Sequence, residues 1–241
     1  MSAWQRVLVK VSGEALMGQK PYGFDPETLS RIAQDLANAR KAGVQLGVVI
    51  GGGNLVRGVK IAAQGIDRVT GDHMGMLGTV MNGLALHGAL TAIGVDTRVL
   101  SAIPVPTMCE DYARQKAVHH FEHNRIVIMV GGTGNPFFTT DTTAVLRAAE
   151  TGCDAILKAT NVDGVYSADP KQDPKATRFE TITAEEALQR RLKVMDTAAF
   201  ALARENGLPI VVFSIHDNKA IAEVCQRRGK FTVVTPELSA A

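Results

Sequence analysis

The feature that most constrains this chain is an apolar run that passes directly into a glycine-rich segment. Residues 125–130 read Arg-Ile-Val-Ile-Met-Val, and residues 131–141 continue as Gly-Gly-Thr-Gly-Asn-Pro-Phe-Phe-Thr-Thr-Asp before a helix-like stretch. Glycine allows close backbone approach, and the first N–H groups of a helix are free to bind an anion. We therefore predict a strand, a ligand loop and a helix, with a phosphate-bearing ligand at the loop.

A second junction has the same form. Residues 45–50 form an apolar run that leads into Gly51, Gly52 and Gly53, and Arg57 follows about one helical turn later. A tight turn with close packing would also explain three glycines. The nearby guanidinium favours phosphate binding, because arginine pairs well with phosphate oxygens.

The alternation of strand-like and helix-like segments predicts the fold class. Apolar, β-branched runs indicate strands at residues 7–11, 44–50, 95–100, 126–130, 155–157, 210–213 and 232–234. Helical periodicity between them predicts an α/β protein whose mostly parallel sheet is covered on both faces and carries its ligand loops at the carboxyl ends of the strands. Residues 163–179 contain turn signals rather than a linker. We therefore expect a single domain over residues 1–241.

Composition excludes several classes of protein. Of the 241 residues, 46% are hydrophobic, and the apolar stretches have only strand length. The N-terminus lacks the apolar segment of a signal peptide, so we expect a cytoplasmic protein without a membrane partner. The net charge of +2 does not require a nucleic-acid partner. Cys109, Cys153 and Cys225 lack a CxxC spacing and are interpreted as reduced structural residues.

Three histidines occur close together, at His119, His120 and His123. A metal cluster is one interpretation, but no cysteine or carboxylate pattern accompanies them. We interpret them as a solvated helix face and predict no metal-binding residues.

Lys10 brings a positive charge to the same edge of the predicted sheet. It lies in the apolar run at residues 7–11, and an ammonium group in such a strand must pair with an anion or reach the end of the strand. The P-loop and G-x-G-x-x-G fingerprints are absent. Lys10 and the two glycine loops together favour phosphoryl transfer, in which positioning and electrostatic stabilisation do most of the catalysis. Acyl transfer is less well supported, because the chain has no G-x-S-x-G elbow.

Several of these segments resemble bacterial uridylate (UMP) kinases of the amino acid kinase superfamily. The resemblance covers essentially the whole chain and rests on residues 10–16, 48–55, 71–77, 132–141, 158–165 and 192–196. It implies a three-layer αβα sandwich with a mostly parallel central sheet. The implied reaction converts UMP and ATP to UDP and ADP with Mg²⁺, in pyrimidine nucleotide biosynthesis.

The resemblance also implies which residues form the site. The implied catalytic residues are Lys10, Arg57 and Asp141. The implied ATP-binding residues are Lys10, Val11, Ser12, Gly13, Gly53, Arg57, Thr160, Asn161, Tyr166 and Asp169. The implied UMP-binding residues are Gly52, Asp72, Thr133, Gly134, Asn135, Pro136, Phe137, Phe138, Thr139 and Thr140.

Three of the carboxylates allow a second interpretation. Asp72 is expected to open a helix and to accept hydrogen bonds from ribose hydroxyls, and a plain N-cap is the alternative. Asp141 and Asp196 are candidates for organising a metal or the acceptor phosphate. An N-cap role for Asp141 and a helix-start role for Asp196 are equally good interpretations.

Family members are typically homohexamers inhibited by UTP, and many are activated by GTP, so the resemblance implies a homohexamer. This chain resembles the GTP-activated relatives at Arg98 and Arg125, but it has His87 and Thr91 where basic residues are expected. Residues 18–23 also differ from the glycine-rich segment that is associated with the response to GTP. We therefore expect UTP inhibition and do not expect GTP activation.

Two alternatives to a UMP kinase remain. One is an enzyme of the same fold with another acceptor, such as carbamate or acetylglutamate. The other is a non-catalytic nucleotide sensor, which would be expected to lack Lys10 or Arg57; both are present.

Overall fold

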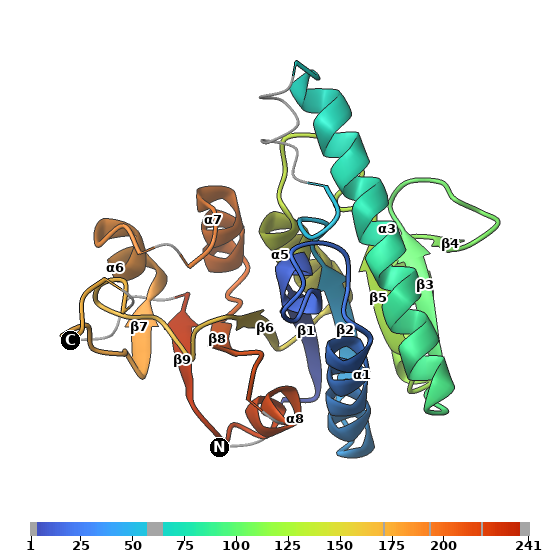
Figure 1. Ribbon diagram of the computed structural model, residues 1–241. Coiled ribbons are helices and arrows are strands. Elements are labelled where there is room, and N and C mark those ends of the chain that lie inside the picture. Colours follow the sequence, from blue (N-terminus) through green and yellow to red (C-terminus); the bar gives the residue numbers. More distant parts are fainter. Residues whose placement is uncertain (1–3, 57–64, 171, 193, 218, 237–241) are drawn as a thin grey trace.

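The computed structural model describes residues 4–56, 65–170, 172–192, 194–217 and 219–236. Within these ranges, one sheet has the strand order β4-β3-β5-β2-β1-β6-β8-β9-β7 (Figure 1). Neighbouring strands are parallel except β8 and β9, which are antiparallel. The strands are β1 (Arg6–Val11), β2 (Gln45–Ile50), β3 (Thr97–Ser101), β4 (Glu110–Asp111), β5 (Ile126–Val130), β6 (Ala155–Thr160), β7 (Thr181–Thr183), β8 (Ile210–Ser214) and β9 (Phe231–Thr235).

Helices cover both faces of this sheet. They are η1 (Gly13–Leu16, a 3-10 helix), α1 (Pro26–Lys41), α3 (Arg68–Ala92), α4 (Arg114–Glu122), α5 (Thr140–Thr151), α6 (Ala184–Gln189), α7 (Thr197–Glu205) and α8 (Ala220–Cys225). None of the described helices is long and apolar enough to cross a membrane.

Side-chain alternation along the strands divides the core into two layers. In β1, Val7, Val9 and Val11 pack in one apolar cluster with side chains of α1, α3 and α8. Leu8 faces the other way and packs in a second cluster with side chains of α4, α5, α6 and α7. Successive residues of a strand point to opposite faces of the sheet. The predicted three-layer αβα sandwich is therefore confirmed.

Helix starts follow capping chemistry, and one of them differs from the sequence prediction. The Asp25 carboxylate accepts a hydrogen bond from Thr28 N at 2.9 Å, and Pro26 occupies the first position of α1. Asp67 caps α3 by accepting from Thr70 N at 3.1 Å. The expectation that Asp72 opens this helix is wrong, because Asp72 lies more than one turn inside it.

All seven predicted strands are present, and the sheet has two further strands, β4 and β7, that the sequence did not indicate. β4 has two residues, both acidic, and β7 has three residues. Neither is long enough to show an alternating apolar pattern.

The order of the strands determines where ligand loops meet. β1 lies between β2 and β6, so the strand order changes direction there, and the segments after β1, β2, β5 and β6 emerge at one edge (Figure 1). Ligands of open parallel sheets bind at such a point, beyond the carboxyl ends of the strands.

Candidate active site

Two lysines on neighbouring strands converge on one carboxylate. Lys10 of β1 and Lys158 of β6 are paired residues in the parallel register. Lys10 Nζ lies 2.8 Å from Asp141 Oδ1, and Lys158 Nζ lies 2.7 Å from Asp141 Oδ2. The side chains are only 10%, 14% and 15% exposed for Lys10, Lys158 and Asp141, respectively. The arrangement places two positive charges and one negative charge at the carboxyl edge of the sheet.

The electrostatics of this trio show why it persists when buried. Burial tends to raise the pKa of Asp141, but the ammonium groups of Lys10 and Lys158 outweigh burial and hold the pKa below 3.8. Burial also lowers the pKa of Lys158, and Asp141 opposes that effect. Each charge therefore depends on the others, since an unpaired buried ion is costly.

Asp141 is held by the start of helix α5 and is not its cap. Thr139 is the N-cap, and its hydroxyl accepts hydrogen bonds from Asp141 N at 3.0 Å and Thr142 N at 3.3 Å. Of the two interpretations left open for Asp141, the N-cap is therefore wrong. The carboxylate projects from the first turn of α5, so it can bind the two lysines.

Asp196 connects this helix start to the next element. Its carboxylate accepts from Ala199 N at 2.8 Å as the N-cap of α7, which confirms its role at a helix start. It also accepts from the hydroxyl of Thr142 at 3.1 Å and from the hydroxyl of Thr139. Helix α7 is thus joined to the loop before α5.

A cavity of about 120 Å³ lies on the α3 side of this trio. It is bounded by the loop after β2, the first turns of α3 and the loop after β5. Among the predicted UMP-binding residues, its lining includes Gly52, Asp72, Thr133, Asn135, Phe138, Thr139 and Thr140. Gly53, which the resemblance assigns to ATP, lines it as well, whereas Gly134, Pro136 and Phe137 lie in the adjoining loop outside the lining.

Asp72 connects the two walls of this cavity. Arg68 Nε donates to both carboxylate oxygens, at 2.8 and 2.9 Å, from one turn earlier in α3. Phe137 N of the opposite loop donates to Asp72 Oδ2 at 2.8 Å. Phe137 has a φ of 71°, which a non-glycine residue rarely adopts. The carboxylate therefore anchors a strained loop while facing the cavity.

Two glycines are required where the loops approach one another. A Cβ atom on Gly13 would lie 2.4 Å from Gly51 O, and one on Gly52 would lie 2.5 Å from Gly75 O of α3. Both obstacles are backbone atoms, so a side chain would force whole segments apart. Gly52 thus confirms the interpretation of close packing, and it also borders the cavity, where phosphate binding stays a prediction.

A second cavity, of about 590 Å³, lies on the β6 side. Its lining includes the predicted ATP residues Thr160, Tyr166 and Asp169 together with Lys158. Tyr166 OH donates to Asp163 Oδ1 at 2.6 Å, which fixes its ring between the turns. Asn161 is exposed beside this cavity, where its Oδ1 lies 3.0 Å from His216 Nε2.

Most predicted site residues therefore gather around two cavities with Asp141 between them. Val11, Ser12 and Gly13 follow Lys10 at the end of β1, where Ser12 is the N-cap of η1. Arg57 lies outside the described residues. Lys158 was missed as a site residue, although the reasoning applied to Lys10 applies to it as well: it is a lysine in an apolar strand.

Comparisons with known proteins show the family to which the chain belongs. A family model described as the amino acid kinase family matches residues 5–214, and the chain belongs to that family. A uridylate kinase of Azorhizobium caulinodans is 61% identical over 97% of this chain and 98% of its own length, and one of Brucella anthropi is 58% identical over 97% of each. A solved UMP kinase structure from Bacillus anthracis superposes with a TM-score of 0.94 at 38% identity, covering 98% of both chains. Within the amino acid kinases, the chain is a member of the uridylate kinase family.

Proposed function

We propose that this enzyme transfers the γ-phosphoryl group of ATP to UMP, giving UDP and ADP. The observation that carries the proposal is the pair of lysines on β1 and β6, linked through Asp141 and flanked by a cavity on each side. The similarity to uridylate kinases over nearly the full chain supports UMP as the acceptor. The α3-side cavity then holds UMP, the β6-side cavity holds the nucleoside of ATP, and the whole chain functions as one amino acid kinase domain.

In this mechanism the lysines stabilise charge on the transferred phosphoryl group. Lys10 and Lys158 are fixed before the substrates arrive, because each is already paired with Asp141. Preorganised charges of this kind stabilise a transition state without reorganisation. Asp141 orients the two ammonium groups. A general base is unnecessary, because the phosphate of UMP is ionised near neutral pH.

We propose that Mg²⁺ enters with ATP as part of the substrate. Both oxygens of Asp141 lie in ion pairs with lysines, and Asp196 already accepts from Ala199 N and two threonine hydroxyls. Both carboxylates are thus already engaged by groups of the protein. Mg²⁺ is commonly bound through substrate phosphates.

The lining of the α3-side cavity suits a nucleotide. Backbone and hydroxyl groups of glycines and threonines predominate among its described lining residues, and such groups can donate hydrogen bonds to phosphate and ribose oxygens. The similarity to uridylate kinases over nearly the full chain favours UMP over carbamate or acetylglutamate. A nucleotide sensor without activity would have no need for two preorganised lysines.

The finer expectations concern assembly and regulation. We propose a cytoplasmic homohexamer in pyrimidine nucleotide biosynthesis that is inhibited by UTP at the UMP pocket. We expect no activation by GTP. In support of this, Arg98 and Arg125 both pair with Asp96, at 2.5 and 2.9 Å, and the cavity beside Arg98 is also lined by Glu110 and Asp111. The negative charge of these carboxylates should repel the triphosphate of GTP.

A coupled ADP-release assay with Mg-ATP tests the proposal. UMP should be the preferred acceptor over CMP, dUMP, carbamate and acetylglutamate. Replacing Lys10 or Lys158 by alanine should lower kcat by at least about 10²-fold, because each removes one preorganised charge. Lys116→Ala, which alters an exposed lysine of α4, is the matched control. Turnover of carbamate or acetylglutamate instead of UMP, or full activity in both site variants, would overturn the assignment.

A further inference from the structure

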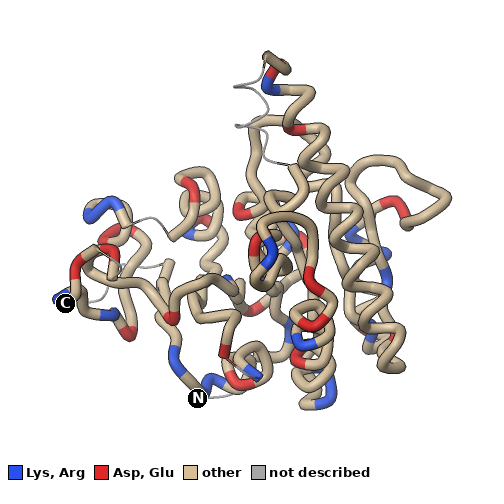
Figure 2. The backbone as a smooth tube through the Cα atoms, in the orientation of Figure 1, with Lys and Arg blue, Asp and Glu red and all other residues tan. Residues whose placement is uncertain are grey.

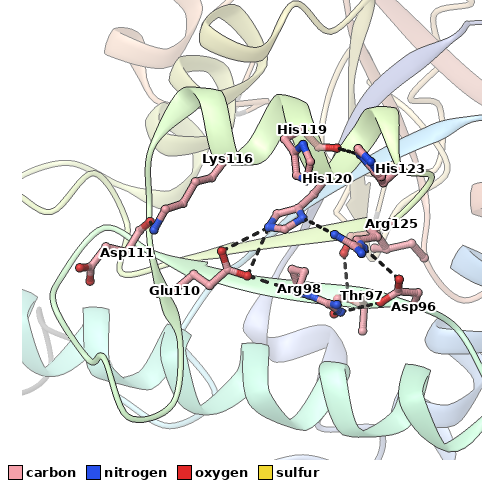
Figure 3. Close-up of polar contacts among 11 residues, drawn as sticks. Asp96, Thr97, Arg98, Glu110, Asp111, Lys116, His119, His120, His123 and Arg125 are labelled. Carbon is pink, nitrogen blue, oxygen red and sulfur yellow. Dashed lines mark hydrogen bonds and ion pairs between the residues drawn. The ribbon is translucent and has the colours of Figure 1, made fainter.

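The three histidines of α4 do not share one environment. His120 is only 6% exposed, and its Nε2 lies 3.2 Å from Glu110 Oε1 (Figure 3). Its Nδ1 lies 3.1 Å from Arg125 NH1, which can only donate, so Nδ1 accepts and Nε2–H donates to Glu110. The prediction of a solvated helix face is therefore wrong for His120, and both of its nitrogens are already used. His119 and His123 are exposed, as predicted.

His119 and His123 form a pair whose rings lie side by side. They are four residues apart, so they share one face of the helix, and their ring centres lie 4.1 Å apart. His123 Nδ1 lies 2.8 Å from the backbone oxygen of His119 (Figure 3). A carbonyl oxygen only accepts, so Nδ1–H of His123 donates in this contact, and in the neutral ring Nε2 then carries the lone pair that can bind a metal ion.

We propose that His119 and His123 form a two-imidazole site for a divalent transition-metal ion. Two histidines four residues apart on a helix are a known way of presenting nitrogen ligands to one ion. Two metal–nitrogen bonds of about 2.1 Å require the two ligating nitrogens to lie within about 4.2 Å of each other. The two rings are already adjacent and both side chains are exposed, so they can rotate until one nitrogen of each meets the same ion. The hydrogen bond from His123 Nδ1 to the backbone orients the ring, as such bonds orient the imidazole ligands of metal sites.

The position of the pair on the helix also favours a cation. Helix α4 ends at Glu122 and His123 is its C-cap, so the pair lies at the negative end of the helix dipole. Among the described residues, no group of three or more His, Cys, Asp or Glu side chains is placed to hold a metal ion. Water therefore completes the coordination sphere. Cu²⁺ should bind most tightly and Zn²⁺ more weakly, whereas Mg²⁺ prefers oxygen ligands.

Metal titration of the full-length protein without nucleotide tests this site. Equilibrium dialysis against Cu²⁺ should give a saturable site whose electron paramagnetic resonance spectrum shows nitrogen ligation. His119→Gln and His123→Gln should each weaken Cu²⁺ binding by roughly tenfold or more, since each removes a ligand and leaves only one imidazole. His216→Gln, which alters a solitary exposed histidine, is the matched control and should bind Cu²⁺ as the unmodified chain does.

Two further measurements distinguish this site from Cu²⁺ bound at scattered single histidines or lost through unfolding. Excess Mg²⁺ should leave Cu²⁺ binding unchanged, and circular dichroism should show that the His119→Gln and His123→Gln variants are folded. If His119→Gln binds Cu²⁺ as tightly as the unmodified chain, or if His216→Gln loses as much binding as His119→Gln, the proposal is overturned.

Discussion

Asp141 shows how much one side chain can organise. It separates two ammonium groups that would otherwise repel each other across neighbouring strands. Replacing it with asparagine removes the carboxylate that pairs with both lysines, and losing one partner of a buried ionic group costs about 3–5 kcal/mol. In the proposed mechanism, the same residue therefore contributes both to stability and to the alignment of charge for phosphoryl transfer.

Acid unfolding tests this dual role. The pKa of Asp141 is below 3.8 in the folded state because the two lysines outweigh burial. Its stabilising contribution is therefore fully present above the unfolded-state value of about 3.9 and is lost as pH falls through the lower folded-state pKa. Urea unfolding from about pH 6 to about pH 3 should show a flatter decline of stability for Asp141→Asn than for the unmodified chain. Asp217→Asn, at an exposed carboxyl, should keep the unmodified slope, and an equally steep decline in both variants would contradict this role.

Arg68 has a positioning role that kinetics can detect. It holds both oxygens of Asp72, which in turn binds the acceptor loop through Phe137 N. Arg68→Gln should raise the KM for UMP by roughly tenfold, the cost of about one charge-assisted hydrogen bond, and should leave the KM for ATP unchanged. Arg68→Lys should recover part of the loss.

The matched control for Arg68 is Arg228→Gln, which breaks an exposed ion pair with Glu223 far along the chain. Equal changes in the KM values for UMP and ATP in Arg68→Gln would point to a general loss of structure and would contradict a positioning role.

Sequence alone predicted a candidate site residue where a charged side chain occurs in an apolar strand. Lys10 was found because an ammonium group in an apolar strand needs a partner, and Lys158 could have been found by the same rule. What sequence could not supply was the partner, since Asp141 is remote from Lys10 in the chain and the ion pair depends on the fold. The contact between Asp72 and Phe137 N could not be predicted from the sequence for the same reason.

At the scale of elements, the close contact between the loop after β2 and helix α3 determines the width of the α3-side cavity, which is proposed to hold UMP. Gly52 packs against the backbone of α3, where a Cβ atom would lie 2.5 Å from Gly75 O. Gly52→Ala should therefore destabilise the protein by on the order of 1–3 kcal/mol through overpacking and should raise the KM for UMP.

Gly88→Ala is the matched control, because Gly88 lies in α3, the helix that Gly52 contacts. It is exposed, and an added Cβ atom would meet nothing within 4 Å. It should stabilise the helix by about 0.5–1 kcal/mol, since glycine is entropically costly in a helix interior. Chemical denaturation of both variants measures the difference, and a Gly52→Ala variant as stable as Gly88→Ala would show that the loop can yield.

Long elements were predictable from sequence, and short or polar ones were not. Strands with apolar runs were all found, because burial on both faces leaves a strong signal. The start of α3 was misplaced because Asp67 and Asp72 are both suitable caps, and only the backbone decides between them: Asp67 is extended, with φ −62° and ψ 155°. The mostly parallel αβα architecture needed only the alternation of elements.

At the scale of the whole molecule, charge is distributed and the thiols are enclosed. Basic and acidic positions are interspersed over the described chain (Figure 2). Burial raises the pKa of Cys153 to about 11 and that of Cys225 to about 12, and it also raises the pKa of Cys109. These three thiols come from distant parts of the chain, so together they report on the integrity of the entire fold.

Thiol labelling should follow global unfolding. Alkylating reagents attack the thiolate, which burial suppresses, so labelling of the native protein near pH 8 should be far slower than that of a free small thiol. In a urea series the three cysteines should become reactive together, at the midpoint measured by circular dichroism. Reactivity of one cysteine well before that midpoint would show that its region opens independently.

The register between β1 and β6 limits which parts of the site can be redesigned. Lys10 and Lys158 occupy paired positions on adjacent strands, so their separation is set by backbone hydrogen bonding. A one-residue insertion in either strand would turn its lysine toward the α1, α3 and α8 layer. Thr133, Asn135 and Pro136 carry no such restriction, because they lie outside the strands and the helices and precede both Phe137, whose N–H binds Asp72, and Thr139, the N-cap of α5. An engineer seeking a new phosphate acceptor should therefore change those residues and leave the strand pairing and the cap of α5 intact.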